Sequence, residues 1–214
     1  MVHMEIDILK RLGLWWSKSW LEDQEGNMIS SSDYLYMPER FSECFWVLFE
    51  RLNYTHDYCL HQLISSEKKL EQLREDAKEY PEIDDHYYWE YNVDVISKST
   101  VLIMMSSFIE WGLKRVLKEL AGSIPQKTNR KISDIEHYIS CIKSEALSNL
   151  DIPIETTHRL NTLRKLRNKF AHGEWELVEP LLKELTFKET FNAISDLFAT
   201  IENLAWESEW GNIK

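Results

Sequence analysis

Apolar residues recur every three or four positions over most of the chain, which is the spacing of amphipathic helices. After Pro38, one row with this spacing predicts a face of a long helix that begins near residue 38: Phe41, Phe45, Leu48, Leu52, Thr55, Cys59 and Leu63. Residues 67–79 are mostly charged, so we expect the end of this helix to cover little core. A second long helix is predicted from Val93 to Leu120, buried on more than one side around residues 101–108.

Polar caps and glycines mark the ends of further helices. Ser133 and Glu136 have the spacing of a capping box, which predicts a helix to about residue 147. Pro153 precedes a helix with an apolar stripe, and Gly173 is placed to end it. A second capping-box spacing at Thr186 opens the last helix. The pattern predicts an all-α protein of about five or six helices.

The predicted helices fall into two regions. Residues 1–84 form an N-terminal helical region, in which Trp15, Trp16 and Trp20 belong either to an arm docked on the body or to a partner-binding patch. Residues 85–214 form a bundle of four helices with short connections. We expect the two regions to make one compact unit.

Composition supports a helical, soluble protein. The 214 residues include only 6 Gly and 5 Pro, too few for a turn-rich all-β fold. The 25 basic and 36 acidic residues give a net charge of −11, which opposes binding to nucleic acid or membranes by bulk charge but leaves room for a small basic site.

Cysteine and histidine usage predicts no disulfide framework, no metal and no cofactor. The 3 cysteines contain no CxxC pair, and no two histidines have a spacing that suggests a shared metal. The N-terminus lacks the basic and apolar regions of a signal peptide, and residues 101–105 are too few to span a bilayer. We therefore expect a cytoplasmic location and no membrane partner.

One stretch concentrates basic charge that the rest of the chain lacks. Residues 164–173 read RKLRNKFAHG and contain Arg164, Lys165, Arg167, Lys169 and His172. An arginine guanidinium matches phosphate oxygens, and a histidine transfers protons near neutral pH. Metal-independent RNA cleavage needs both services, because a base must deprotonate the ribose 2′-OH and a cation must stabilise the charged phosphorane.

Helix geometry limits how Arg167 and His172 could cooperate. Residues five apart on a regular helix point about 140° apart, whereas Asn168 and His172, four apart, share a face. Either Gly173 ends the helix and frees His172, or a second copy of the chain supplies the complement across a two-fold axis.

The run Arg167-Asn168-Lys169-Phe170-Ala171-His172 resembles the R-N-x-x-x-H signature of the HEPN superfamily. The segment Ser106-Ser107-Phe108-Ile109-Glu110 is similar to the apolar helix with an internal Glu in these domains. The resemblance covers roughly residues 90–208. Glu174 departs from the pattern, because many members paired with nucleotidyltransferase antitoxins have a Tyr there.

The resemblance implies a four-helix bundle that dimerises through its motif helices and cleaves RNA without metal, as a toxin or an antiviral effector. Arg167 would contact the scissile phosphate, and His172 would serve as acid or base. Asn168 would hold the helix end or orient His172, and Glu110 would be a polar partner within the bundle. The other basic residues of the helix would bind RNA: Arg164, Lys165 and Lys169. An antitoxin or another protein partner is expected.

Two alternatives stay open. The chain could be a non-catalytic HEPN-like module that binds a protein partner or a nucleotide, or a purely structural helical protein in which the motif is a coincidence.

Overall fold

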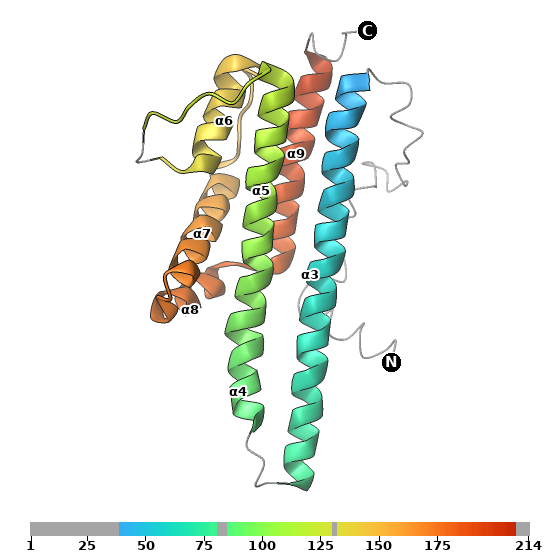
Figure 1. Ribbon diagram of the computed structural model, residues 1–214, viewed down its shortest axis with the longest axis vertical. Coiled ribbons are helices and arrows are strands. Elements are labelled where there is room, and N and C mark those ends of the chain that lie inside the picture. Colours follow the sequence, from blue (N-terminus) through green and yellow to red (C-terminus); the bar gives the residue numbers. More distant parts are fainter. Residues whose placement is uncertain (1–38, 81–84, 130–131, 209–214) are drawn as a thin grey trace. The chain divides into compact units, whose positions relative to one another are not determined.

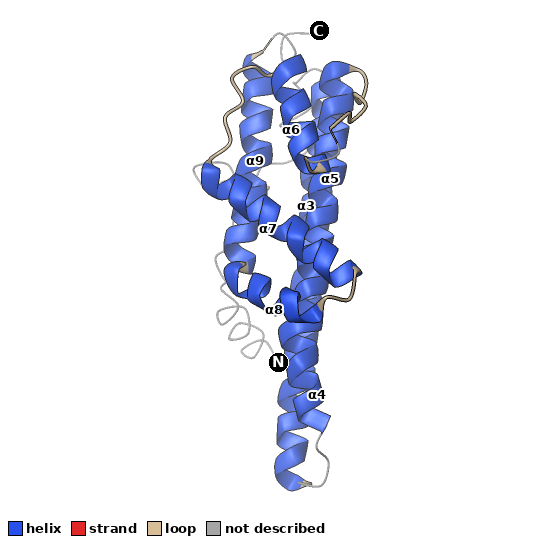
Figure 2. Cartoon of the chain, turned by 90° about the vertical axis from the view of Figure 1, so that its left-hand side faces the viewer, coloured by secondary structure: helices blue, strands red, loops and turns tan. Residues whose placement is uncertain are grey.

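All secondary structure that the computed structural model describes is helical. The described residues are 39–80, 85–129 and 132–208, and no strand occurs among them (Figures 1 and 2). The helices are α3 (Glu39–Glu79), α4 (Asp85–Tyr91), the π-helix η1 (Asn92–Ser97), α5 (Lys98–Ala121), α6 (Asp134–Glu145), α7 (Ile154–Ala171), α8 (Trp175–Glu184) and α9 (Phe187–Glu207). The prediction of an all-α protein is confirmed.

Two predictions concern other parts of the chain. The three N-terminal tryptophans lie outside the described residues. The predicted boundary at residue 84 adjoins residues 81–84, which also lie outside them, so the division at that point stays a prediction.

The 41-residue helix α3 follows the apolar row that predicted it. Its row is buried from Phe41 to Leu63 except at the half-buried Thr55, with Phe45, Leu48 and Leu52 fully enclosed. Leu70 is the last buried residue, and no side chain from 71 to 79 is buried. The charged end of α3 therefore covers little core, as its composition predicted.

The helical segment from residue 85 to 121 begins eight residues earlier than predicted and contains an unpredicted π-helix. Val93 and Val95 in η1 are both buried, although residues two apart point to opposite sides of a regular α-helix. This turn of the helix is therefore enclosed on two sides. Gly122, with a φ of +74°, ends the helix as a left-handed C′ residue.

The apolar character of this helix raises the question of whether it could span a membrane. Residues Tyr87–Ala121 are long and apolar enough to cross a bilayer, with a mean hydropathy of 1.2 over the best window. Half of that window is buried inside the protein. Core helices of soluble proteins have the same character, so this helix alone does not indicate a membrane span.

The contacts divide the chain into two compact units. Of the described residues, one unit, called unit A, combines those within 55–106 and 161–191. The other, called unit B, combines residues 39–54, those within 107–160, and 192–208.

In unit B, the first part of α3 packs with α5, α6 and α9. The Arg115 guanidinium of α5 donates to the Glu43 carbonyl of α3 at 2.8 Å. The Phe108 and Phe198 rings join α5 to α9 edge to face, 5.8 Å apart. The Lys114 ammonium lies 5.5 Å from the centre of the Tyr138 ring, which places α6 beside α5. Trp206 of α9 packs against Phe41 of α3.

In unit A, the rest of α3 packs against η1 and the start of α5. The Ser66 and Ser97 hydroxyls are 2.8 Å apart, and the Cys59 thiol lies 3.9 Å from the Val101 carbonyl oxygen. The helix α8 contacts η1. Unit A contains the C-terminal part of α7 and the whole of α8.

Candidate functional site

The predicted site residues lie on the last turns of α7, and the chain leaves this helix through a Schellman turn. The Glu174 amide donates to the Lys169 carbonyl at 3.0 Å, and the Gly173 amide donates to the Phe170 carbonyl at 3.1 Å. This pair of hydrogen bonds, with Gly173 at a φ of +70°, defines the motif. His172 is the C-cap residue, so the prediction that Gly173 ends the helix is confirmed.

Side-chain contacts also stabilise this turn. The Lys169 ammonium contacts the Glu174 carboxylate at 2.5 Å, joining the two residues whose backbones already share a hydrogen bond. The Phe170 and Trp175 rings meet edge to face, 4.9 Å apart. The backbone that carries His172 is thus held by hydrogen bonds, an ion pair and an aromatic contact.

The three motif residues differ in exposure. Asn168 and His172 are exposed on the surface, and Arg167 is half-buried beside the fully buried Leu166. The His172 amide still donates to the Asn168 carbonyl at 3.0 Å, so the helical register reaches His172. Arg167 and His172 therefore keep the divergence of about 140° that residues five apart have on a helix.

The sequence left two ways for Arg167 and His172 to act together: release of His172 at the helix end, or a contribution from a second copy of the chain. The end of the helix at Ala171 does not release His172 from the helical register. Within one chain, α7 does not aim Arg167 and His172 at the same point. A site that uses both side chains on one phosphate is therefore not formed by α7 of one chain alone.

The three predicted RNA-binding residues are in different environments. Lys165 is exposed, whereas Lys169 is engaged with Glu174. Arg164 is half-buried, and its Nε is enclosed with no hydrogen-bond partner among the described residues. Because this Nε is enclosed, it is not accessible to an anion in this conformation.

Glu110 is half-buried on α5 in unit B, whereas residues 161–173 belong to unit A. Its predicted role as a polar partner within the bundle stays a prediction.

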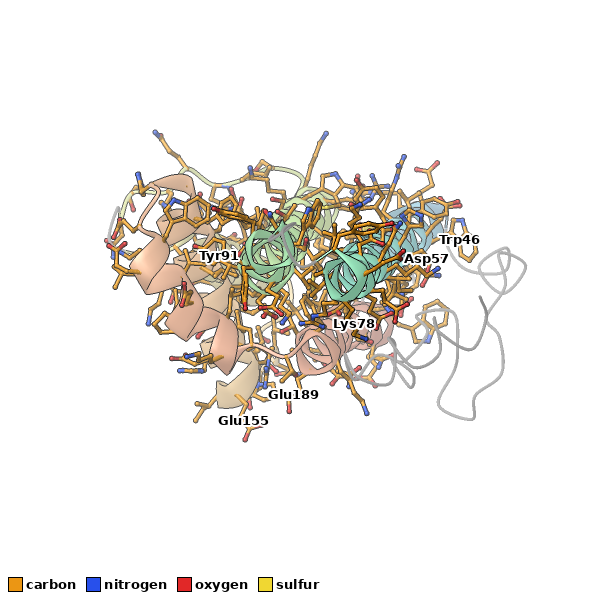
Figure 3. All side chains as sticks on the ribbon, turned by 90° about the horizontal axis from the view of Figure 1, so that it is seen from below. Trp46, Asp57, Lys78, Tyr91, Glu155 and Glu189 are labelled. Atoms are coloured by element: carbon orange, nitrogen blue, oxygen red, sulfur yellow. The ribbon has the colours of Figure 1, made fainter. Side chains whose placement is uncertain are left out.

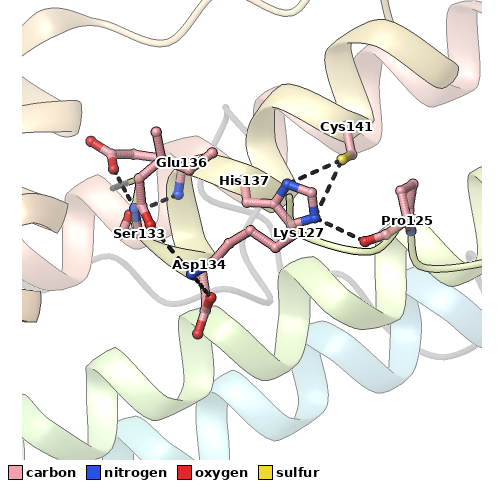
Figure 4. Close-up of polar contacts among 8 residues, drawn as sticks. Pro125, Lys127, Ser133, Asp134, Glu136, His137 and Cys141 are labelled. Atoms are coloured by element: carbon pink, nitrogen blue, oxygen red, sulfur yellow. Dashed lines mark hydrogen bonds and ion pairs between the residues drawn. The ribbon is translucent and has the colours of Figure 1, made fainter. Parts of the chain in front are cut away.

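A cysteine–histidine contact on α6 is the other arrangement with the residue types of a catalytic pair (Figure 4). His137 Nε2 lies 2.9 Å from the Pro125 carbonyl oxygen. A carbonyl only accepts, so Nε2 carries the proton in this contact. The Cys141 sulfur lies 3.7 Å from Nδ1 and 3.8 Å from Nε2.

These nearly equal distances place the sulfur against the ring rather than along the lone pair of one nitrogen. Burial also raises the pKa of Cys141, with a smaller contribution from the nearby Glu145 carboxylate. A raised pKa keeps the thiol protonated, which is opposite to the activation that a nucleophilic cysteine needs. The pair is a packing contact.

Metal clusters and cavities add no further site residues. Among the described residues, no group of three or more His, Cys, Asp or Glu side chains could hold a metal ion. One open depression of about 510 Å³ lies along residues 68–78 of α3, and one of about 220 Å³ lies between residues 146–149 and 204–208. Neither is lined by a predicted site residue.

The sequence did not predict helix α8, although it directly follows the motif. Leu177, Val178, Leu181 and Leu182 have helical spacing, but Pro180 within the segment argued against a helix. The helix forms because Val178 is buried and α8 contacts η1, at the cost of the hydrogen bond that Pro180 cannot donate. The opposite charges of Lys169 and Glu174 on either side of Gly173 are the sequence feature that could have predicted the closed turn before α8.

Comparisons with known proteins returned no match to a family model, a curated protein or a solved structure.

Proposed function

We propose that this protein is a HEPN-type endoribonuclease that acts as a cytoplasmic homodimer, as a toxin or an antiviral effector. The helices α5, α6, α7 and α9 follow one another along the chain in the order that the resemblance implies, with the motif on α7. The proposal rests on the residues of the motif and on where α7 presents them.

The observation that carries the proposal is the end of α7. The motif residues Arg167, Asn168 and His172 occupy the last turns of a regular helix, and His172 is exposed on a turn that is closed by several contacts. Proton transfer to a substrate requires an accessible imidazole in a fixed position, because misplacement of a catalytic group is costly. The His172 imidazole is accessible, and the backbone that carries it is held by the turn.

The proposed reaction is an internal transesterification. His172 removes the proton of the ribose 2′-OH, and the 2′-oxygen then attacks the adjacent phosphorus. The Arg167 guanidinium stabilises the negative charge on the non-bridging oxygens. The 5′-oxygen leaves with a proton from an imidazolium, which yields a 2′,3′-cyclic phosphate and a 5′-hydroxyl end.

The divergence of Arg167 and His172 on one helix supports a site built from two copies. A two-fold axis at α7 would place Arg167 of one copy near His172 of the other. The exposed Lys165 on the same helix would supply a phosphate contact that raises RNA affinity without taking part in the chemistry.

The first experiment is an RNA cleavage assay in EDTA with the wild type, Arg167→Ala and His172→Ala. We expect cleavage by the wild type with 2′,3′-cyclic phosphate ends, and a loss of at least about 10²-fold in each variant. The matched control is His158→Ala, which removes an exposed histidine from the same helix and should leave the rate unchanged.

Retained cleavage in both motif variants would contradict the mechanism. If the folded wild type cleaves no RNA, the non-catalytic HEPN-like module becomes the better description.

A further inference from the structure

Trp175, the first residue of α8, lies beside the turn that carries His172. Figure 3 draws the described side chains and labels Glu155 in the first turn of α7, whereas His172 and Trp175 follow the other end of this helix. A Cβ on Gly173 would lie 3.9 Å from Trp175 Nε1, so the indole reaches the backbone of the residue after His172. The indole therefore lies against the turn that presents the histidine of the proposed reaction.

The Trp175 ring is held in place and is still open to solvent. Phe170 of α7 contacts it edge to face, with the ring centres 4.9 Å apart. The hydrogen bond from the Glu174 amide to the Lys169 carbonyl ties the residue before Trp175 to the same helix. Even so, 37% of Trp175 is exposed. An aromatic ring that is already fixed loses little conformational entropy when a flat ligand binds to it.

The charge of this stretch suits a nucleic-acid strand. Residues 164–176 contain four Lys or Arg and two Glu, in a chain with a net charge of −11. Glu174 is paired with Lys169, and Lys165 is exposed. A phosphate backbone that passes here meets a local excess of positive charge. Positive charge beside an exposed aromatic ring is the combination that binds single strands.

We propose that Trp175 stacks on the base of the nucleotide whose 2′-OH is deprotonated by His172. This inference rests on the proposed ribonuclease function. The base and the 2′-OH are attached to the same ribose, so a nucleotide that places its 2′-OH at His172 brings its base to the surroundings of the turn. Every base has a flat π-surface that an aromatic ring can cover. Trp175 is thus a positioning residue, which holds the nucleotide without transferring a proton.

Stacking on Trp175 requires an unpaired nucleotide. In a duplex each base is covered by its neighbours, so a side chain reaches the flat surface of a base only where that base is splayed out or single-stranded. Trp175 should therefore add affinity for a single strand and none for a duplex. This difference separates stacking from a merely structural role, because a distorted turn would weaken the binding of both forms alike.

The test measures binding of the full chain to a fluorescein-labelled 2′-O-methyl RNA of mixed sequence and about 12 nucleotides, by fluorescence anisotropy at about 150 mM salt. The 2′-O-methyl group blocks the nucleophile, so binding is measured without cleavage. We expect Trp175→Leu to bind the single strand at least about tenfold more weakly than the wild type. The affinity for the same strand annealed to its complement should not change.

Two variants serve as controls. Trp175→Phe keeps an aromatic ring and should retain the single-strand affinity within about threefold. Trp206→Leu removes a tryptophan of unit B that is 46% exposed and packs edge to face on Phe41, and it should bind as the wild type does. Circular dichroism checks that each variant is folded. If Trp175→Leu does not fold, Trp175→Met takes its place, because its flexible side chain keeps an apolar contact with Phe170.

Four results would overturn the proposal. They are no binding of the single strand to the wild type, equal single-strand affinity of the wild type and Trp175→Leu, and an equal loss for single strand and duplex. The fourth is a change from dimer to monomer in Trp175→Leu by size-exclusion chromatography, which would assign Trp175 to a subunit contact.

The cleavage assay separates these failures from failure of the proposed function. Cleavage by the wild type with an unchanged rate and single-strand affinity in Trp175→Leu would contradict the stacking site alone. Strand binding that depends on Trp175, without any cleavage by the wild type, would contradict the ribonuclease activity alone.

Discussion

At the scale of single residues, burial is the main cause of displaced pKa values among the described groups. Desolvation raises the pKa of Cys44 and of Cys59 to about 12, so both thiols are protonated at physiological pH. The Arg115 guanidinium beside Cys44 lowers its pKa, but by less than burial raises it. These cysteines behave as small apolar core residues rather than as nucleophiles.

The lowered pKa of His56 should make the stability of the protein depend on pH. Desolvation lowers the pKa of His56 below its ordinary 6.5, and the Asp57 carboxylate opposes this shift only in part. The unfolded chain therefore binds a proton on His56 more readily than the folded chain does. The contribution of the neutral His56 to stability is fully present above pH 6.5 and is lost as the pH falls below it. The free energy of unfolding should fall more steeply from pH 7 to pH 5 in the wild type than in His56→Phe.

The His56→Phe variant keeps an aromatic ring against Phe191, which lies 4.6 Å from the His56 ring. Parallel pH profiles of the two proteins in urea unfolding would show that His56 does not titrate differently in the folded state.

A substitution at Gly112 can test how closely α5 approaches α9. A Cβ on Gly112 would lie 2.5 Å from the Phe198 ring, so Gly112→Ala should destabilise unit B. Overpacking costs about 1–3 kcal/mol, and the better helix propensity of Ala offsets about 1 kcal/mol of this. The measurement is urea unfolding of the wild type and the variant.

The matched background is Phe198→Leu, which shortens the opposing side chain. Gly112→Ala should cost less there than in the wild type, since the two residues then no longer clash. Equal costs in both backgrounds would mean that the destabilisation has another origin.

At the scale of elements, local capping chemistry decides where the described helices begin and end. Ser133 Oγ accepts from the Glu136 amide at 3.0 Å, and the Glu136 carboxylate accepts from the Ser133 amide at 2.7 Å. This reciprocal capping box begins α6 at the residue that the sequence predicted. A similar Thr186–Glu189 contact precedes α9.

Loss of the α6 cap should weaken the protein measurably. Ser133→Ala removes the side-chain acceptor of a buried cap and should lower the free energy of unfolding by about 1 kcal/mol. Ser140→Ala in the exposed interior of α6 is the control and should change stability by less than about 0.5 kcal/mol. A Ser133→Ala effect no larger than the control would show that the cap does not stabilise α6.

At the scale of the whole molecule, the proposed site depends on the association of two chains. If each site combines Arg167 of one chain with His172 of the other, a heterodimer of Arg167→Ala and His172→Ala has one intact site and one that lacks both groups. Equal mixing with full subunit exchange should restore about a quarter of the wild-type cleavage rate, since half of the dimers are mixed and each has one of two sites.

The control is each variant alone, which should be inactive. Exchange is verified by native mass spectrometry with one isotope-labelled variant. An inactive mixture with confirmed heterodimers would mean that Arg167 and His172 of one chain serve the same site, contrary to the geometry of α7.

The sequence by itself determined the all-α class, the apolar face of α3, the ends of α5 and α7 and the start of α6. It could do so because these features depend on contacts within a few residues: helical spacing of apolar side chains, a capping box at Ser133 and left-handed glycines at Gly122 and Gly173.

Only the tertiary structure decided the π-helix η1, the helix α8 with its internal Pro180, and the closeness of Gly112 to Phe198. Each of these is locally unfavourable and forms because residues distant in sequence bury apolar surface or approach one another. The same division holds for the candidate site. The sequence selected Arg167 and His172, and the regular end of α7 decided that they diverge within one chain, because backbone hydrogen bonds hold His172 in the helical register.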